Sequence, residues 1–161
     1  HQELVVLLSS VFQDTVGWTG LGKVLPGANI TDMEEGWTHN YRCPDVVVFL
    51  NGGRAINRET HFFGGPDFAV EIVSENDRSR EKLPFYARVG VRELLLVDRD
   101  PWVLELFRLQ EDRLMPVGRS TLENPDVLAS TVLPLSFGLI PGETRPRIAV
   151  AHEDGIARWV L

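Results

Sequence analysis

Cysteine is almost absent from this sequence, because Cys43 is the only one among 161 residues. A single thiol excludes an intrachain disulfide and a zinc site made of several cysteines, and it gives no sign of an oxidising compartment. Long apolar runs are also missing, since no window approaches the roughly 18 consecutive apolar residues that a membrane span needs. We therefore expect a soluble, cytoplasmic protein with no membrane partner.

Positive charge is scarce as well. The chain has 16 Lys and Arg against 23 Asp and Glu, which gives a net charge of -7. Proteins that coat nucleic acid through a broad basic face neutralise phosphates with Lys and Arg, so that class is disfavoured, while a local basic patch remains open. The chain also begins at His1 instead of Met, without the flanks of a signal peptide, and we expect it to be part of a longer protein.

The apolar pattern predicts one α+β domain, over residues 1–161, with a mixed sheet. Apolar spacings of three to four predict a helix over residues 3–16, and a second helical stretch is predicted to end at Gly90. Ser74, Asn76, Asp77 and Ser79 are candidate N-caps for that second helix. Strands are predicted over residues 44–50, 67–73, 93–97, 102–109, 114–117 and 127–133, followed by a final hairpin that turns at residues 154–155.

One acidic residue interrupts the most apolar strand, in GPDFAVEIVS. A buried and unpaired Glu71 would cost several kcal/mol or shift its pKa, so it needs a partner. Because strand side chains alternate, Glu71 shares a face with Ala69 and Val73, and Asp45 similarly points with Val47. If the two strands are neighbours, Asp45 and Glu71 converge, and a cation such as Mg²⁺ would relieve their repulsion.

On spacing alone, a structural role for these acids is favoured over a metal site, because ion-pair networks perturb carboxylates as readily as active sites do. Glu71 could form a buried ion pair with Arg88 or Arg92, and Asp45 could simply begin its strand after a proline. Tyr86 is most simply a core or cross-strand residue. The helical segment that ends at Gly90 is locally basic through Arg78, Arg80, Lys82 and Arg88, and these side chains either face solvent or contact phosphate. The isolated histidines are predicted to be surface or turn residues; these are His1, His39, His61 and His152.

Two longer segments, YRCPDVVVF and GPDFAVEIVSENDRSREKLPFYARVGVRELLLVDRD, resemble the bacterial Uma-two family of restriction endonucleases. This family is a branch of the PD-(D/E)XK superfamily. The resemblance is close over residues 41–109 and looser over 1–31 and 120–140. It implies a restriction endonuclease-like α/β sandwich, in which helices flank a mixed central β-sheet. It also implies an endonuclease that hydrolyses DNA with Mg²⁺ or Mn²⁺, for which a homodimer would suit cleavage of both strands.

By the same resemblance, Asp45 and Glu71 would bind the metal, with the backbone carbonyl of Ile72 as a further ligand. The superfamily lysine that positions the attacking water would stand two residues after Glu71, where this chain has Val73. In the family the lysine is moved to the following helix, which here offers Lys82. If that helix starts near residue 83, with Pro84 in its first turn, Lys82 lies on the loop that approaches it.

Two further interpretations remain. The family usually has an upstream extended segment with an acidic residue, which the sequence does not include, and its loss together with Val73 would fit a catalytically inactive interaction or oligomerisation module. A hydrolase of another phosphoester would need the same metal site, and the sequence does not separate it from a DNA nuclease.

Overall fold

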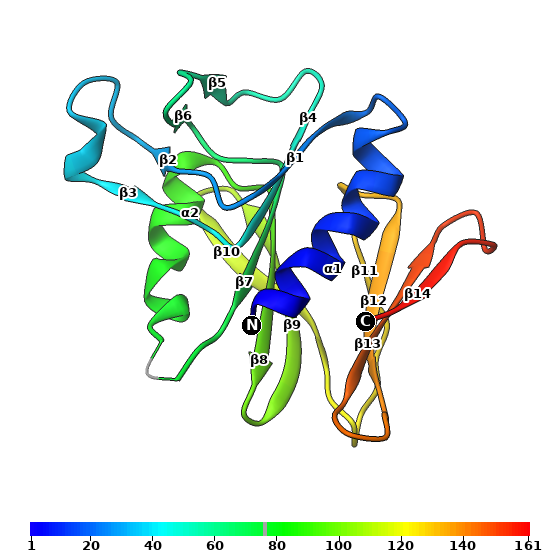
Figure 1. The fold of residues 1–161 in the computed structure, drawn as a ribbon. Coiled ribbons are helices and arrows are strands. Elements are labelled where there is room, and N and C mark those ends of the chain that lie inside the picture. The colour runs from blue at the N-terminus through cyan, green and yellow to red at the C-terminus, as the bar shows by residue number, and fades with distance from the viewer. Residues whose placement is uncertain (76) are drawn as a thin grey trace.

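A six-stranded mixed sheet forms the centre of the computed structural model, which describes residues 1–75 and 77–161 (Figure 1). The strands lie in the order β1-β4-β7-β8-β9-β10. β7 and β8 are parallel, and parallel strands require a crossover connection, which α2 provides here. The other neighbours are antiparallel. The bounds are β1 Gly22–Pro26, β4 Val46–Leu50, β7 Phe68–Ile72, β8 Glu93–Arg99, β9 Trp102–Gln110 and β10 Arg113–Ser120.

The first helix and a second sheet pack on one face of this large sheet (Figure 1). Helix α1, Gln2–Phe12, continues into a π-helical turn, Gln13–Gly17, so the predicted helix has the right extent but changes type in its last turn. The apolar face that predicted this helix is buried, as Leu8 and Phe12 show with no exposed surface. The second sheet consists of β11 Leu128–Ala129, β12 Leu135–Ile140, β13 Arg147–His152 and β14 Arg158–Val160.

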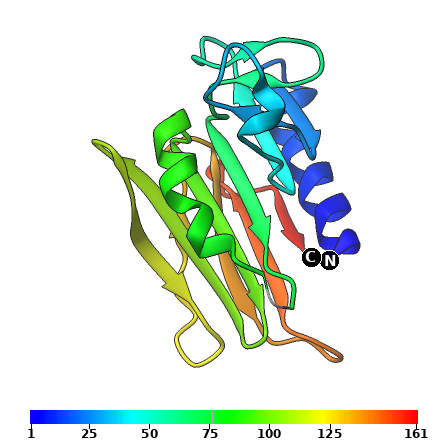
Figure 2. The same cartoon turned by 90° about the vertical axis from the view of Figure 1, so that its left-hand side faces the viewer.

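Helix α2, Leu83–Val89, packs on the other face (Figure 2). Its buried residues, among them Phe85 and Tyr86, contact the apolar side chains of β4, β7 and β8. A 3₁₀ turn, Ser79–Lys82, precedes the helix, so Pro84 does stand in its first turn, and Gly90 ends it with a φ of 86°. Ser74, Asp77 and Ser79 form no side-chain capping bond at the start of the 3₁₀ turn or of α2, so their prediction as N-caps is wrong. Asn76, the fourth candidate, lies outside the described residues.

A small third sheet extends beside α2, built from two-residue strands. Its order is β3 Tyr41–Arg42, β2 Ile30–Thr31, β6 Phe62–Phe63 and β5 Ile56–Asn57, with a 3₁₀ turn at Trp37–His39. An ion pair of 2.7 Å between Arg88 Nε and Asp32 Oδ2 connects this sheet to α2. Strands of two residues are too short to show an alternation of side chains.

Most of the longer predicted elements are confirmed, including the final hairpin, where Gly155 turns with a φ of 74°. The strand predicted over residues 127–133 is wrong, because only Leu128–Ala129 is extended. Residues 130 and 131 instead turn inward and bind the buried Glu93 of β8. Within the described residues, no helix has the length and apolar character needed to cross a membrane.

Candidate metal centre

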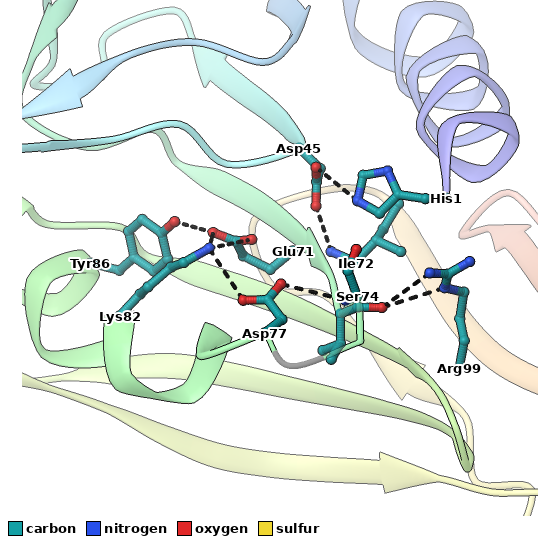
Figure 3. A network of polar contacts seen from close by, with 10 residues as sticks. His1, Asp45, Glu71, Ile72, Ser74, Asp77, Lys82, Tyr86 and Arg99 are labelled. Carbon is teal, nitrogen blue, oxygen red and sulfur yellow. Dashed lines mark hydrogen bonds and ion pairs between the residues drawn. The ribbon is translucent and has the colours of Figure 1, made fainter.

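The two predicted acids lie at the same end of adjacent strands. β4 and β7 pair Val46 with Val70 and Val47 with Ala69, so the register extended by one residue sets Asp45 opposite Glu71. Asp45 is held there by its backbone, whose N–H donates to the carbonyl of Val70 at 3.0 Å. The N–H of Ile72 in turn donates to Asp45 Oδ2 at 2.7 Å. The predicted adjacency of the two strands is thus confirmed, and it sets the two acids opposite each other. The Glu71 carboxylate lies toward Lys82 and Tyr86, and the Asp45 carboxylate toward Ile72 and His1 (Figure 3).

Glu71 is almost fully buried, and α2 supplies its polar partners. The hydroxyl of Tyr86 donates a hydrogen bond to Glu71 Oε1. The ammonium group of Lys82 lies 3.3 Å from Oε1 and 3.2 Å from Oε2 (Figure 3). A carboxylate with a cation and a hydroxyl donor at this depth is paired in the way that burial requires.

The arginines that could have formed the alternative ion pair are engaged elsewhere. Arg88 binds Asp32, and Arg92 NH1 lies 3.2 Å from Asp67 Oδ1. The interpretation of Glu71 as the partner of a structural arginine is therefore wrong, because its cation is the lysine at the start of α2.

Lys82 reaches this position because the 3₁₀ turn ends on it, immediately before the α-helix begins. A second carboxylate lies on its other side, since Asp77 Oδ1 is 3.8 Å from Lys82 Nζ. The lysine side chain is 28% exposed, whereas that of Glu71 is 3% exposed. The ammonium group thus lies at the boundary between the buried carboxylate and solvent, where an entering phosphate could meet it.

Burial dominates the electrostatics of the acids. It raises the pKa of Asp45, and the donated N–H of Ile72 and the charge of Lys82 oppose that shift only in part. Burial also raises the pKa of Glu71, and the negative charge of Asp45 adds to the increase. The pKa of the Tyr86 hydroxyl is raised by burial and by Glu71, so at neutral pH the phenol stays protonated and acts as the hydrogen-bond donor.

This donor set fits a hard cation with oxygen ligands. Among the described residues, no three or more His, Cys, Asp or Glu side chains gather in a way that could hold a metal ion. A site here would therefore rest on the Asp45 and Glu71 carboxylates, with a backbone carbonyl such as that of Ile72. Mg²⁺ is commonly held by one or two carboxylates and keeps its other positions for water and phosphate. The pair therefore suits Mg²⁺ better than Zn²⁺, which usually takes several Cys or His ligands.

Two residues of the site were not recognised in the sequence. Tyr86 is a core residue as predicted, but it lies on a helix and its hydroxyl serves Glu71; its spacing of four from Lys82 on a helical stretch is the signal that could have indicated this. His1 is not a free surface residue, because its Nε2 lies 3.2 Å from Asp45 Oδ1. His61 is likewise buried, and it stacks on Trp37 with 4.7 Å between ring centroids.

Comparison of the sequence with known families gives a match to a family model. The Uma2 model, described as "Putative restriction endonuclease", matches residues 1–141. The chain belongs to the Uma2 family. The match includes all of the large sheet and α2, and so the elements that carry Asp45, Glu71 and Lys82.

A solved structure confirms the fold of this Uma2 chain. It is the crystal structure of "a putative nuclease belonging to DUF820" from Anabaena variabilis, with a TM-score of 0.60 and 18% sequence identity. The alignment covers 81% of this chain and 71% of that one. The predicted α+β fold of the restriction endonuclease-like type is therefore confirmed. Comparison with curated proteins gives no match.

Proposed function

We propose that this Uma2 chain is a Mg²⁺-dependent endonuclease that hydrolyses phosphodiester bonds of DNA, with Mn²⁺ as a substitute metal. The observation that carries the proposal is the pairing of β4 with β7, which sets Asp45 opposite Glu71, together with the ammonium group of Lys82 beside Glu71. The description of the family as a restriction endonuclease supports the same chemistry.

The acids have the metal-binding role in this proposal. The carboxylates of Asp45 and Glu71 and the carbonyl of Ile72 would hold the ion, and the N–H of Ile72 keeps Asp45 oriented for it. When bound, Mg²⁺ lowers the pKa of water and stabilises the charge that develops on a phosphodiester under in-line attack. A bound cation would also offset both the desolvation of the buried Glu71 carboxylate and its repulsion from Asp45.

Lys82 lies on the substrate side of Glu71 in this proposal, and Tyr86 lies on the protein side. The ammonium of Lys82 would orient the attacking water and lie close to the negative charge that grows on the phosphate. Tyr86 touches no substrate in this scheme. Its hydroxyl donates to Glu71 Oε1 and so fixes the orientation of the carboxylate.

Plasmid cleavage tests the proposal. We expect the protein to nick or linearise supercoiled DNA with Mg²⁺ or Mn²⁺ and to stop when EDTA removes the metal. Asp45→Asn and Glu71→Gln should each lower the rate about 100-fold or more, because the metal supplies several kcal/mol of transition-state stabilisation. The exposed Glu123→Gln is the matched control and should cleave like the unaltered protein. Equal nicking by all three variants would remove the proposal.

A catalytically inactive module remains the second candidate, and one contact set favours it. Lys82 and Tyr86 by themselves provide Glu71 with a charge partner and a donor, so the pair could be purely structural. Calorimetric titration with Mg²⁺ separates the two, since the nuclease must bind the ion and the module need not. DNA as the substrate instead of another phosphoester, a homodimer, a cytoplasmic location and a single domain over residues 1–161 stay predictions.

A further inference from the structure

Two guanidinium groups lie over one aromatic ring close to the candidate metal centre. Arg42 Cζ is 4.9 Å from the ring centroid of Phe85, and Arg88 Cζ is 5.5 Å from it. Phe85 itself is 4% exposed, so α2 holds this ring firmly. Cation–π contacts of this kind position an arginine without neutralising it.

Arg42 is the less neutralised of these two arginines. Arg88 is paired with Asp32, whereas Arg42 donates from NH1 to the carbonyl of Tyr41 at 2.7 Å. In the part of the chain that the structure describes, no carboxylate lies within ion-pair distance of Arg42. It stands three residues before Asp45 on the same stretch, and its charge acts on the Tyr86 hydroxyl of the site. The remaining donors of Arg42 thus lie over Phe85 without an acidic partner among the described residues.

A pocket of about 550 Å³ lies at the other end of α2, and it is cationic. Arg54, Arg88 and Arg92 line it, and so do Gly52 and Gly90, where an added Cβ would meet nothing within 4 Å. Asp67 also lines the pocket and pairs with Arg92. No described carboxylate lies within ion-pair distance of Arg54, so no ion pair offsets the positive charge of this arginine.

The contacts connect the metal centre to this pocket along α2. Lys82 and Tyr86 contact Glu71, Phe85 carries Arg42 and Arg88, and Arg88 reaches the pocket. The other basic residues before α2 do not contribute, because Arg78 pairs with Glu81 and Arg80 with Glu105 and Asp98. From Lys82 to Gly90 the helical rise of about 1.5 Å per residue gives roughly 12 Å, which spans a few nucleotides at about 3.4 Å per step.

We propose that the DNA backbone follows this line, with Arg42 on the phosphate next to the cleaved one and Arg54 on a phosphate a few nucleotides away. The inference rests on the proposed function and names the groups that grip its substrate. Charge complementarity selects a polyanion as the occupant. The net charge of the whole chain is -7, so two arginines without an ion-pair partner along this line, Arg42 near the start of α2 and Arg54 in the pocket at its end, mark a local exception.

The salt dependence of DNA binding tests this path. Binding of a short duplex is measured by fluorescence anisotropy over a series of KCl concentrations, with Ca²⁺ in place of Mg²⁺. Arg42→Gln and Arg54→Gln should each lower the slope of log K against log[salt] by about 0.9, the value for one lost phosphate contact, and the double variant by the sum. Arg42→Lys keeps the charge and should retain most of the slope.

The matched control is Arg158→Gln, an exposed arginine of β14 in the second sheet, which should leave the slope unchanged. Thermal unfolding of each variant checks that the fold is intact. If the unaltered protein cleaves and binds DNA but the double variant keeps its slope, the path is wrong and the proposed function stands. If the unaltered protein neither binds nor cleaves DNA, both are wrong.

Discussion

Glu71 is a carboxylate in the interior of the large sheet, with 2% of its surface exposed. A carboxylate on a strand buried on both faces is unfavourable unless donors and a cation accompany it. Here the donor is a phenol and the cation is a lysine at the boundary of the core, and Asp45 adds a second negative charge nearby. Nothing in such an arrangement is needed for a stable sheet, since an apolar residue would fit the strand better. The free-energy cost of burying this carboxylate is consistent with a functional role for the two acids.

The hydroxyl of Tyr86 provides a test at this scale. Tyr86→Phe removes the hydroxyl donor from Glu71 while keeping the ring that fills the core. We expect the metal-free protein to lose about 1–3 kcal/mol of its free energy of unfolding, because a buried acceptor loses its partner. Urea denaturation followed by circular dichroism measures this loss.

Tyr41→Phe is the control for that experiment, because Tyr41 is 41% exposed and should tolerate the change within about 0.5 kcal/mol. Equal stability of the two variants would show that the Tyr86 hydroxyl contributes nothing to Glu71.

Among the elements, the turn before α2 decides whether the lysine reaches the acids. The sequence indicates that Pro84 belongs to the first turn of a helix and that Lys82 therefore precedes it, and the structure agrees. It does not indicate that the preceding residues form a 3₁₀ turn, which directs Lys82 back over β7. Such a turn leaves no periodic signal, because it is only four residues long.

A second buried acid connects the elements of the large and second sheets. Glu93 in β8 has no exposed surface and accepts from Arg108 Nε at 2.8 Å, from Ser130 Oγ at 2.5 Å and from Thr131 Oγ1 at 2.8 Å. These bonds hold the loop between β11 and β12 against the large sheet. Removal of the carboxylate would take away the acceptor of all these bonds.

We therefore expect Glu93→Ala to lower the free energy of unfolding by about 3–5 kcal/mol, as the loss of one member of a buried charged network does. Chemical denaturation measures the change, and the exposed Glu123→Gln should lie within about 0.5 kcal/mol of the unaltered protein. A loss no larger for Glu93→Ala than for this control would mean that the network does not hold the sheets together.

At the scale of the whole molecule, the long apolar runs made the large sheet predictable. The runs 44–50 and 67–73 are apolar on both faces, which predicted β4 and β7, and the pairing of these strands sets Asp45 opposite Glu71. Packing between distant segments was not predictable in the same way. The final hairpin was expected, but not its place in a second sheet against α1, since that depends on contacts which no local pattern encodes.

The central claim is that Asp45 and Glu71 share one divalent cation, and a crystal soaked in Mn²⁺ tests it most directly. The account predicts an anomalous density peak between the two carboxylates, with oxygen ligands at about 2.0–2.2 Å and Lys82 displaced from at least one oxygen of Glu71. A map without such a peak, in which Lys82 and Tyr86 still hold Glu71 at full metal concentration, would contradict it.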